Sequence, residues 1–217
     1  RRLIARRVKT LKVKLGKLKQ QRVVQRRSRT RTGAISVSLV GYTNAGKSTL
    51  FNALTHAGAY AADQLFATLD TTSRRLFLEE GHQVILSDTV GFIRELPHSL
   101  IEAFRATLEE TAMADLILHV VDSLSAARNE QVVEVNKVLK EIGAADVPQI
   151  LVWNKIDRSS ANTVISPGVD TDEYGKISRI RLSAKTGIGV EMLRHAMIQF
   201  SASKSASQRE ESHIPEQ

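Results

Sequence analysis

Residues 41–49 read GYTNAGKST, and they follow the apolar, β-branched run AISVSLV of residues 34–40. Gly41 and Gly46 bracket the spacing GxxxxGKS, in which the backbone N–H groups of a loop wrap a phosphate group. A Cβ atom at either glycine would obstruct this close approach. The helix that begins at Lys47 points the positive end of its dipole at the same anion. A strand, a phosphate loop and a helix in this order predict an α/β fold of the P-loop NTPase class.

The side chains that end this loop indicate a nucleoside triphosphate bound with Mg²⁺. Lys47 can place a positive charge between the β- and γ-phosphates, and the Ser48 hydroxyl can ligate the metal. The loop residues expected to contact the nucleotide are Gly41, Tyr42, Thr43, Asn44, Ala45, Gly46, Lys47, Ser48 and Thr49.

Strand and helix patterns alternate along the rest of the chain. The strands are expected at residues 35–41, 74–80, 83–88, 116–122, 149–154 and 178–183, with a hairpin around Gly81. The helices are expected at residues 47–57, 98–112, 126–142 and 188–200. Such alternation predicts a mostly parallel six-stranded sheet with helices on both faces. Residues 158–175 are expected to form a surface loop.

The charge of the chain is divided between two regions. The 217 residues carry a net charge of +8, but residues 1–32 alone hold fourteen Lys or Arg and no acid. The remainder has a net charge of −6, so the basic region is one stripe that attracts polyanions such as RNA. The chain has no cysteine, and no apolar run approaches a membrane span. We therefore expect a protein of the cytoplasm.

These patterns divide the chain into three parts. Residues 1–32 are expected to be a basic α-helix, because Ile4, Val8, Leu11, Leu15 and Leu18 form a coiled-coil-like seam. This helix is either the last arm of a helical hairpin or a nucleic-acid-binding helix, and the two interpretations are compatible. Residues 33–203 form the nucleotide-binding domain, and residues 204–217 are expected to be a flexible tail.

Two further motifs distinguish guanine from adenine. NKID, residues 154–157, ends a buried strand, where the ligands of open α/β sheets bind. The Asp157 carboxylate can accept hydrogen bonds from N1 and N2 of guanine, and adenine offers no such donors. Asn154 and Lys155 are expected to brace the loop and cover the base. SAK, which is Ser183, Ala184 and Lys185, ends the next strand, and its backbone N–H groups can reach guanine O6.

A fourth motif, DTVG, should respond to the terminal phosphate. It also lies at a strand end and consists of Asp88, Thr89, Val90 and Gly91. Asp88 can hold a water bound to Mg²⁺, and the Gly91 N–H group can contact the γ-phosphate. The motif loses this contact when the γ-phosphate leaves, so we expect it to be a moving part of a switch.

The threonine-rich segment LFATLDTT, residues 65–72, is the other candidate for a moving part. Thr68 is the candidate for the second protein ligand of Mg²⁺, although Thr71 and Thr72 compete for this role by position. The segment's residues expected near the nucleotide are Phe66, Ala67, Thr68, Leu69 and Asp70. The residues expected to act on the terminal phosphate are therefore Lys47, Thr68 and Gly91.

The residue after DTVG is not one that can position water. Many GTPases place a glutamine there, whereas this chain has Phe92, whose ring cannot orient water by hydrogen bonding. We therefore expect slow intrinsic hydrolysis that a partner or a cation completes. Arg94 fits a surface salt bridge better than an arginine finger. His119 and Trp153 lie in buried strand patterns, so we interpret both as core residues.

The motifs together resemble the GTPase domain of the HflX family of ribosome-associated bacterial GTPases. The resemblance covers about residues 33–200 and is most specific in DTVGFIRELPHSLIEAF, which begins at Asp88. It implies that Thr68 is the switch threonine on Mg²⁺. It also implies that Asn44 either helps to hold a monovalent cation or braces the loop as an amide. Residues 1–32 resemble the final helix of the family's N-terminal region.

The resemblance also implies partners and an activity. A protein of this family would bind and hydrolyse GTP, associate with the 50S subunit or the 70S ribosome through rRNA, and promote ribosome splitting or rescue, notably under heat stress. We also expect a monomer. We expect the present chain not to split ribosomes without the remainder of the N-terminal region. Two alternatives share the nucleotide motifs: a GTPase of RNA modification or ribosome assembly, and an RNA-binding module whose nucleotide site is structural.

Overall fold

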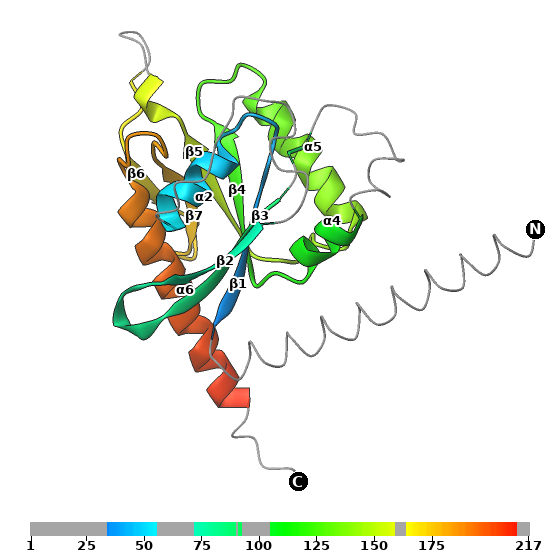
Figure 1. Cartoon of the computed structure of the whole chain (residues 1–217), viewed down its shortest axis with the longest axis vertical. Helices are drawn as coiled ribbons and strands as arrows, with labels where there is room; N and C mark the ends of the chain where they lie inside the picture. The colour runs from blue at the N-terminus through cyan, green and yellow to red at the C-terminus, as the bar shows by residue number, and fades with distance from the viewer. Residues whose placement is uncertain (1–33, 56–71, 90, 93–104, 159–163, 212–217) are drawn as a thin grey trace, which may run out of the picture. The chain divides into compact units, whose positions relative to one another are not determined.

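A computed structural model describes residues 34–55, 72–89, 91–92, 105–158 and 164–211 of the chain. The contacts within the chain divide it into two units, residues 1–34 and residues 35–217. The expected basic helix at residues 1–32 lies outside the described residues, so it stays a prediction. The second unit contains the nucleotide motifs and is the one described below (Figure 1).

A seven-stranded sheet forms the centre of this unit, in the order β2-β3-β1-β4-β5-β7-β6. Its strands are β1 (Ile35–Gly41), β2 (Thr72–Phe77), β3 (Gln83–Asp88), β4 (Leu116–Asp122), β5 (Gln149–Asn154), β6 (Gly168–Thr171) and β7 (Ile177–Arg181). The five central strands are parallel, and the edge strands β2 and β6 are antiparallel to their neighbours. The prediction of a mostly parallel sheet is confirmed, as is the hairpin of β2 and β3, but the sheet has seven strands rather than the six predicted.

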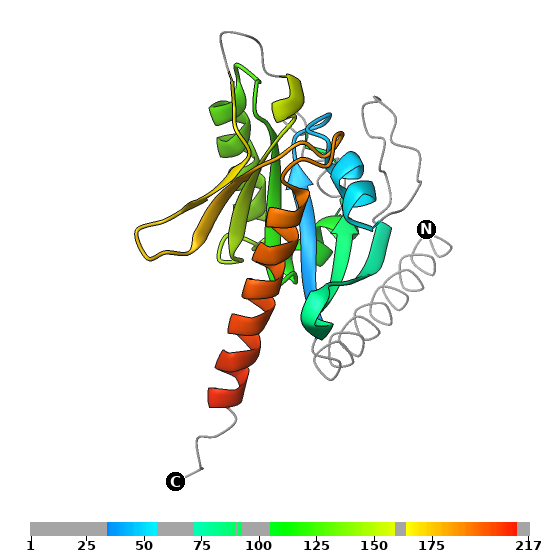
Figure 2. The same ribbon diagram turned by 90° about the vertical axis from the view of Figure 1, so that its left-hand side faces the viewer.

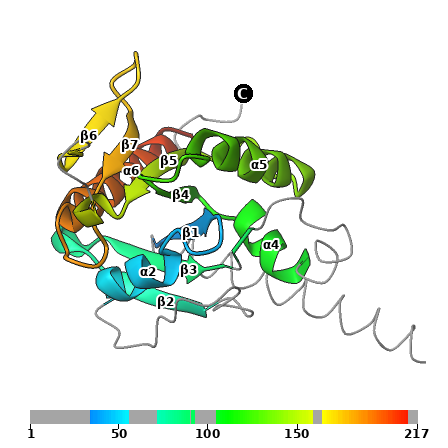
Figure 3. The same ribbon diagram turned by 90° about the horizontal axis from the view of Figure 1, so that it is seen from above.

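Helices cover both faces of the sheet, as predicted (Figure 3). They are α2 (Lys47–Thr55), α4 (Arg105–Ala112), α5 (Arg128–Glu141) and α6 (Val190–Glu211), with the short 3-10 helices η1 (Glu79–Gly81) and η2 (Ile156–Arg158). The part of the expected helix 98–112 that precedes residue 105 lies outside the described residues. Helices α2 and α6 pack on one face, and α4 and α5 pack on the other.

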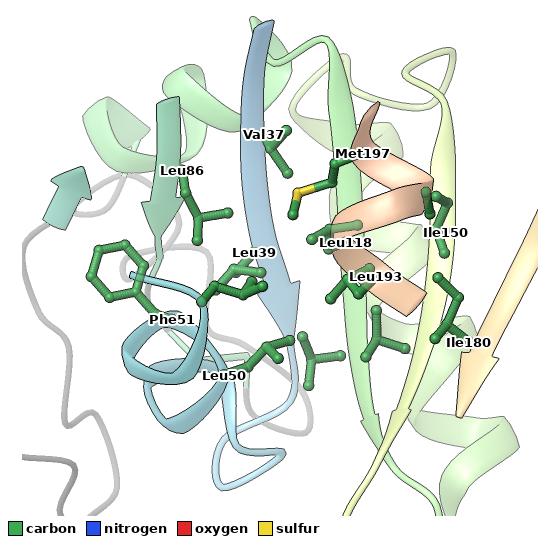
Figure 4. Close-up of a cluster of buried hydrophobic side chains, with 14 of the residues drawn as sticks. Val37, Leu39, Leu50, Phe51, Leu86, Leu118, Ile150, Ile180, Leu193 and Met197 are labelled. Atoms are coloured by element: carbon green, nitrogen blue, oxygen red, sulfur yellow. The ribbon is translucent and has the colours of Figure 1, made fainter. Parts of the chain in front are cut away.

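The larger core joins α2 and α6 to the sheet (Figure 4). Leu39 of β1 and Leu118 of β4 are fully buried there, against Leu50 of α2 and Leu193 of α6. Burying a leucine of this kind contributes roughly 1.5–3 kcal/mol to the free energy of unfolding. This core therefore fixes α2, and with it the phosphate loop, on the parallel strands.

Two expectations about the C-terminal part are wrong. Residues 168–171, expected within a loop, form β6, which pairs with β7 in the hairpin that Figure 2 shows projecting from the sheet. The helix expected to end at residue 200 continues to Glu211, so residues 204–211 are helical rather than a loose tail. Lys204 forms an ion pair with Asp115, and this contact ties the extension to the turn before β4.

His119 of β4 is the buried, hydrogen-bonded core histidine that the sequence predicts. Only 1 % of its surface is exposed. Burial lowers the pKa of His119 to about 4; the nearby charge of Lys47 lowers it further, and a hydrogen bond to Gln149 acts in the opposite direction. The ring is therefore neutral at neutral pH.

This burial makes the stability of the fold depend on pH. The unfolded chain takes up a proton on His119 near its ordinary pKa of about 6.5, and the folded chain does so only near about 4. Stability is therefore complete above about pH 6.5 and falls as the pH drops toward 4. We expect His119 to account for a loss of ~2 kcal/mol between about pH 7 and pH 5. Urea unfolding of the wild type and of His119→Gln checks this, and equal pH slopes for the two would contradict it.

Candidate nucleotide-binding site

Neighbouring chain segments leave no space for a side chain at either glycine of the phosphate loop. Gly41 has a backbone φ of +148°, and a Cβ there would lie 2.1 Å from the Val120 carbonyl oxygen of β4. Gly46 has a φ of +94°, and its Cβ would lie 2.3 Å from the Asn154 amide nitrogen. Side chains are strained in this region of φ, and these contacts leave no space for one. The sheet and the NKID loop thus set the shape of the phosphate loop.

Lys47, the first residue of α2, points back over this loop. Its Nζ donates hydrogen bonds of 3.1 Å to the carbonyl oxygens of Gly41 and Tyr42. Burial lowers the pKa of Lys47 to about 8, and the negative charge of Asp88 partly opposes this shift. A desolvated ammonium group with weakly compensated charge interacts more strongly with an anion than one in water does. The loop thus holds a desolvated positive charge at the position for which the sequence predicts contact with phosphate.

Ser48 and Asp88 meet at the position that the sequence assigns to Mg²⁺. The Ser48 hydroxyl donates a 2.7 Å hydrogen bond to Oδ2 of Asp88, which is buried at the end of β3. Both groups offer oxygen atoms, the ligands that Mg²⁺ prefers, and the metal usually keeps several waters beside one or two protein ligands. The donor set therefore fits this ion, with Ser48 as the direct ligand and Asp88 beside it.

The segment after β3 is fastened along the phosphate loop. The Thr89 hydroxyl donates to the Leu39 carbonyl oxygen at 2.6 Å, and this threonine is fully buried. Phe92 donates its N–H to the Gly41 oxygen and accepts from the Thr43 N–H, at 3.1 and 2.7 Å. A Cβ at Gly91 would lie 2.7 Å from Thr43 Cγ2 and 3.2 Å from Lys47 Nζ. Gly91 is thus placed beside the Lys47 ammonium group, which is predicted to contact the phosphates.

The Phe92 side chain is buried in the core on the face of the sheet that α4 and α5 cover. Only 2 % of its surface is exposed, and it packs in a cluster with Leu108 of α4 and Val135 and Leu139 of α5. The position after DTVG therefore serves packing in this chain. This geometry agrees with the expectation that Phe92 does not orient water.

Asn154 joins three parts of the site. Its side-chain amide donates to the Ala45 carbonyl oxygen and accepts from the Ala184 N–H, both at 2.9 Å. The residue is 2 % exposed, so both bonds are shielded from water. The predicted brace between the NKID loop and the phosphate loop is present, and it extends to the SAK loop. Ala184 would have to share its N–H between Asn154 and guanine O6.

Asp157 and Ser183 define the expected base-binding end. Asp157 is exposed, and its Oδ1 accepts a 2.6 Å hydrogen bond from the Ser183 hydroxyl, which in turn accepts from the Thr186 N–H. The sequence analysis missed this role of the Ser183 hydroxyl, because it considered only the backbone N–H groups of the SAK loop. Lys185 is exposed beside it.

Asp122 is a second residue that sequence reasoning missed. It ends β4, and its carboxylate forms a 2.9 Å ion pair with Lys155. The Lys155 ammonium also donates to the Asn44 carbonyl oxygen at 2.5 Å. A signal was available, since an acidic residue that ends a buried strand lies beside the strand that carries NKID.

Several predicted site residues lie outside the described part of the chain. They are Phe66, Ala67, Thr68, Leu69, Asp70, Thr71, Val90 and Arg94. Thr72 is described and begins β2. The assignment of Thr68 to Mg²⁺ therefore stays a prediction.

The described loops lie at the carboxyl ends of β1, β3, β4, β5 and β7, on one edge of the parallel sheet. This edge is where α/β folds bind nucleotides. Residues 36–155 match the family described as "50S ribosome-binding GTPase". The chain belongs to this GTPase family. Its members bind and hydrolyse GTP, and the order of the motifs agrees with that chemistry.

Individual relatives confirm the resemblance to HflX. The chain is 49 % identical to "GTPase HflX" of Escherichia coli K12 over 91 % of its own length and 46 % of that protein. It is also 49 % identical to "GTPase HflX" of Caldanaerobacter subterraneus, over 91 % of its length and 44 % of that protein. The chain thus spans about half the length of the curated relatives it matches.

A solved structure shows the same fold. A GTP-binding protein from the archaeon Sulfolobus solfataricus, in complex with GDP, has a TM-score of 0.59 and 26 % identity; the match covers 90 % of this chain and 61 % of that one. Within the described residues of this chain, no helix combines the length and apolar character needed to cross a membrane.

Proposed function

We propose that this protein is a GTP-dependent switch that associates with the large ribosomal subunit or the 70S ribosome and promotes ribosome splitting or rescue under stress. The observation that carries the guanine-nucleotide part is the meeting of four motifs at one sheet edge, with Asn154 bonded to the phosphate loop and to the SAK loop. The GDP complex of the archaeal relative supports the same ligand.

In the proposed complex, the nucleotide lies along this edge. The backbone N–H groups of residues 42–48 surround the β-phosphate, and Lys47 exchanges its two loop carbonyls for phosphate oxygens. The Asp157 carboxylate accepts from the guanine base, and Lys155 covers the base. Ser48 holds Mg²⁺ with Asp88 beside it, and Thr68 is proposed as the second protein ligand. The metal supplies neutralisation of phosphate charge when bound.

Hydrolysis transfers the γ-phosphoryl group to water. The bond between the γ-phosphorus and the bridging β-phosphate oxygen breaks, and GDP and phosphate leave. Lys47 neutralises charge that develops on these oxygens, and the Gly91 N–H contacts the γ-phosphate. Because Phe92 is buried, the group that orients the water comes from a bound partner or a cation. A monovalent cation at Asn44 is one such source; Asn44 is exposed, with a backbone φ of +57°.

The ribosomal part of the proposal rests on two supports. The family to which the chain belongs is described as ribosome-binding. In addition, residues 1–32 carry a charge of +14, which favours contact with the phosphate backbone of rRNA. Loss of the γ-phosphate releases Gly91 and Thr68, and this release is proposed to weaken the ribosome-bound state.

Sedimentation with ribosomes tests this proposal. The 217-residue chain is mixed with 50S, 30S and 70S particles in the presence of a non-hydrolysable GTP analogue, GDP or no nucleotide. We expect binding to 50S and 70S that is about tenfold tighter with the analogue than with GDP, because only the analogue engages Gly91. Lys47→Ala serves as the control that removes the nucleotide dependence. Binding to RNA that ignores the nucleotide, or binding confined to free RNA, would contradict the ribosomal switch.

A further inference from the structure

Lys155 has an unusual backbone and a doubly anchored side chain. Its φ is +68°, in the left-handed region that non-glycine residues occupy at a cost. Its ammonium group lies between the Asn44 carbonyl oxygen, at 2.5 Å, and Oδ2 of Asp122, at 2.9 Å. Its Cε atom passes within 3.9 Å of the Cβ position at Gly46. The side chain thus lies across the phosphate loop, and two acceptors on different elements hold its end.

Asp122 is placed for this contact by the sheet. It pairs with Asn154 across the parallel strands β4 and β5, so its side chain starts next to the NKID loop. The following residue, Ser123, donates its N–H to the Asn154 carbonyl oxygen at 3.0 Å. The ion pair is largely sheltered, with 16 % of the Lys155 side chain and 24 % of the Asp122 side chain exposed. Such shelter limits the screening that weakens surface ion pairs.

We propose that Asp122 is a positioning residue that slows the release of guanine nucleotide by holding Lys155 across the phosphate loop. This inference rests on the proposed nucleotide site. Asp122 holds the Lys155 ammonium group, and Lys155 in turn holds the Asn44 carbonyl group. These two contacts together fix the separation between the phosphate loop and the NKID loop. Without the carboxylate, a single carbonyl oxygen holds the ammonium group. The cover over the base and the shape of the phosphate loop then fluctuate together.

Asp122 also has a local structural role, which the test must preserve. Its Oδ1 accepts a 3.1 Å hydrogen bond from the Leu124 N–H, in the turn that leads to α5. Asp122→Asn keeps the size of the side chain and an oxygen for Leu124, and it places an amide donor opposite the Lys155 ammonium. The substitution therefore removes the lysine contact and leaves the turn intact.

The measurement is the release rate of fluorescent GDP from the full chain, with the melting temperature without nucleotide as the check on folding. We expect Asp122→Asn to release GDP about tenfold faster, since a charge-assisted hydrogen bond of this kind is lost. Single-turnover hydrolysis of GTP already bound should change less than about twofold. Asp122→Glu, which keeps the charge, should restore release to within about threefold of the wild type. Asp146→Asn, an exposed carboxylate in the turn between α5 and β5, is the matched control.

A double-mutant cycle separates action through Lys155 from any other role. In a Lys155→Met background, which keeps the length of the stem without the charge, Asp122→Asn should change GDP release by less than about twofold. The inference is overturned if Asp122→Asn still speeds GDP release about tenfold in the Lys155→Met background. It is also overturned if the wild type retains GDP and the single variant Asp122→Asn releases GDP at the same rate as the wild type. A wild type that releases GDP and ADP equally fast would instead overturn the proposed nucleotide site itself.

Discussion

Replacing Lys47 by alanine is expected to weaken binding of both GTP and GDP at least ~100-fold, which is about 2.7 kcal/mol. The reason lies in the burial of this ammonium group, whose charge the two loop carbonyl dipoles compensate only in part. Calorimetric titration with Mg²⁺ present measures the effect. Lys176→Ala, which removes an exposed lysine from the turn between β6 and β7, should leave the affinity unchanged.

The pH dependence of the nucleotide affinity of the wild type provides a second measure of the role of Lys47. Burial lowers the pKa of Lys47 to about 8 in the free protein, and bound phosphates stabilise its charged form and raise that pKa. Affinity is therefore complete below about pH 8 and falls as the pH rises above it, by up to about tenfold per unit. Lys47→Ala should lack this dependence. Unchanged affinity in Lys47→Ala would mean that the phosphates do not bind in this loop.

The second large effect is expected from Asp157→Asn, which should lower the affinity for GTP about 100-fold and raise that for xanthosine triphosphate. In the proposed complex the carboxylate accepts hydrogen bonds from N1 and N2 of guanine, whereas an asparagine amide would face the N2 amino group with a donor of its own. Xanthine carries an oxygen at that position, so the amide can donate to it. Ser183 already orients the side chain through a 2.6 Å hydrogen bond.

Competition against fluorescent GDP measures this exchange of preference. Wild type and Asp157→Asn are titrated with GTP, xanthosine triphosphate and ATP, and Asp146→Asn, which removes an exposed carboxylate from the turn between α5 and β5, is the control. If Asp157→Asn lowered the affinities for GTP and ATP equally and did not raise the affinity for xanthosine triphosphate, Asp157 would support the loop without contacting the base.

The sequence predicts the nucleotide motifs well because each of them requires special residues locally. Gly41 and Gly46 occupy φ values that favour glycine, and Asn154 needs an amide that both donates and accepts. Each of these requirements selects particular residue types within a short stretch of sequence. The strand, loop and helix around Lys47 could therefore be placed from the sequence alone.

The missed features depend on partners far away in the sequence. Strand β6 reads GVDT and has no clear alternation of its own; it exists because it pairs with β7, where Asp170 forms ion pairs with Arg179 and Arg181. Residues 204–211 of α6 are mostly polar and contain two serines, and the prediction ended the helix too early because it followed apolar spacing. The sequence shows Asp122 only as an acidic residue at the end of a buried strand; its contact with Lys155 depends on the parallel register of β4 and β5, which pairs it with Asn154.

The buried ring of Phe92 also limits how this protein can be redesigned. A glutamine at that position would leave a hole between α4, α5 and the sheet, and its amide would start inside an apolar cluster. One substitution therefore could not turn the chain into a fast, self-sufficient hydrolase without weakening its own scaffold. A gain in the rate of hydrolysis is therefore expected to come from a group other than the residue at position 92, such as the partner proposed to bind at the nucleotide edge.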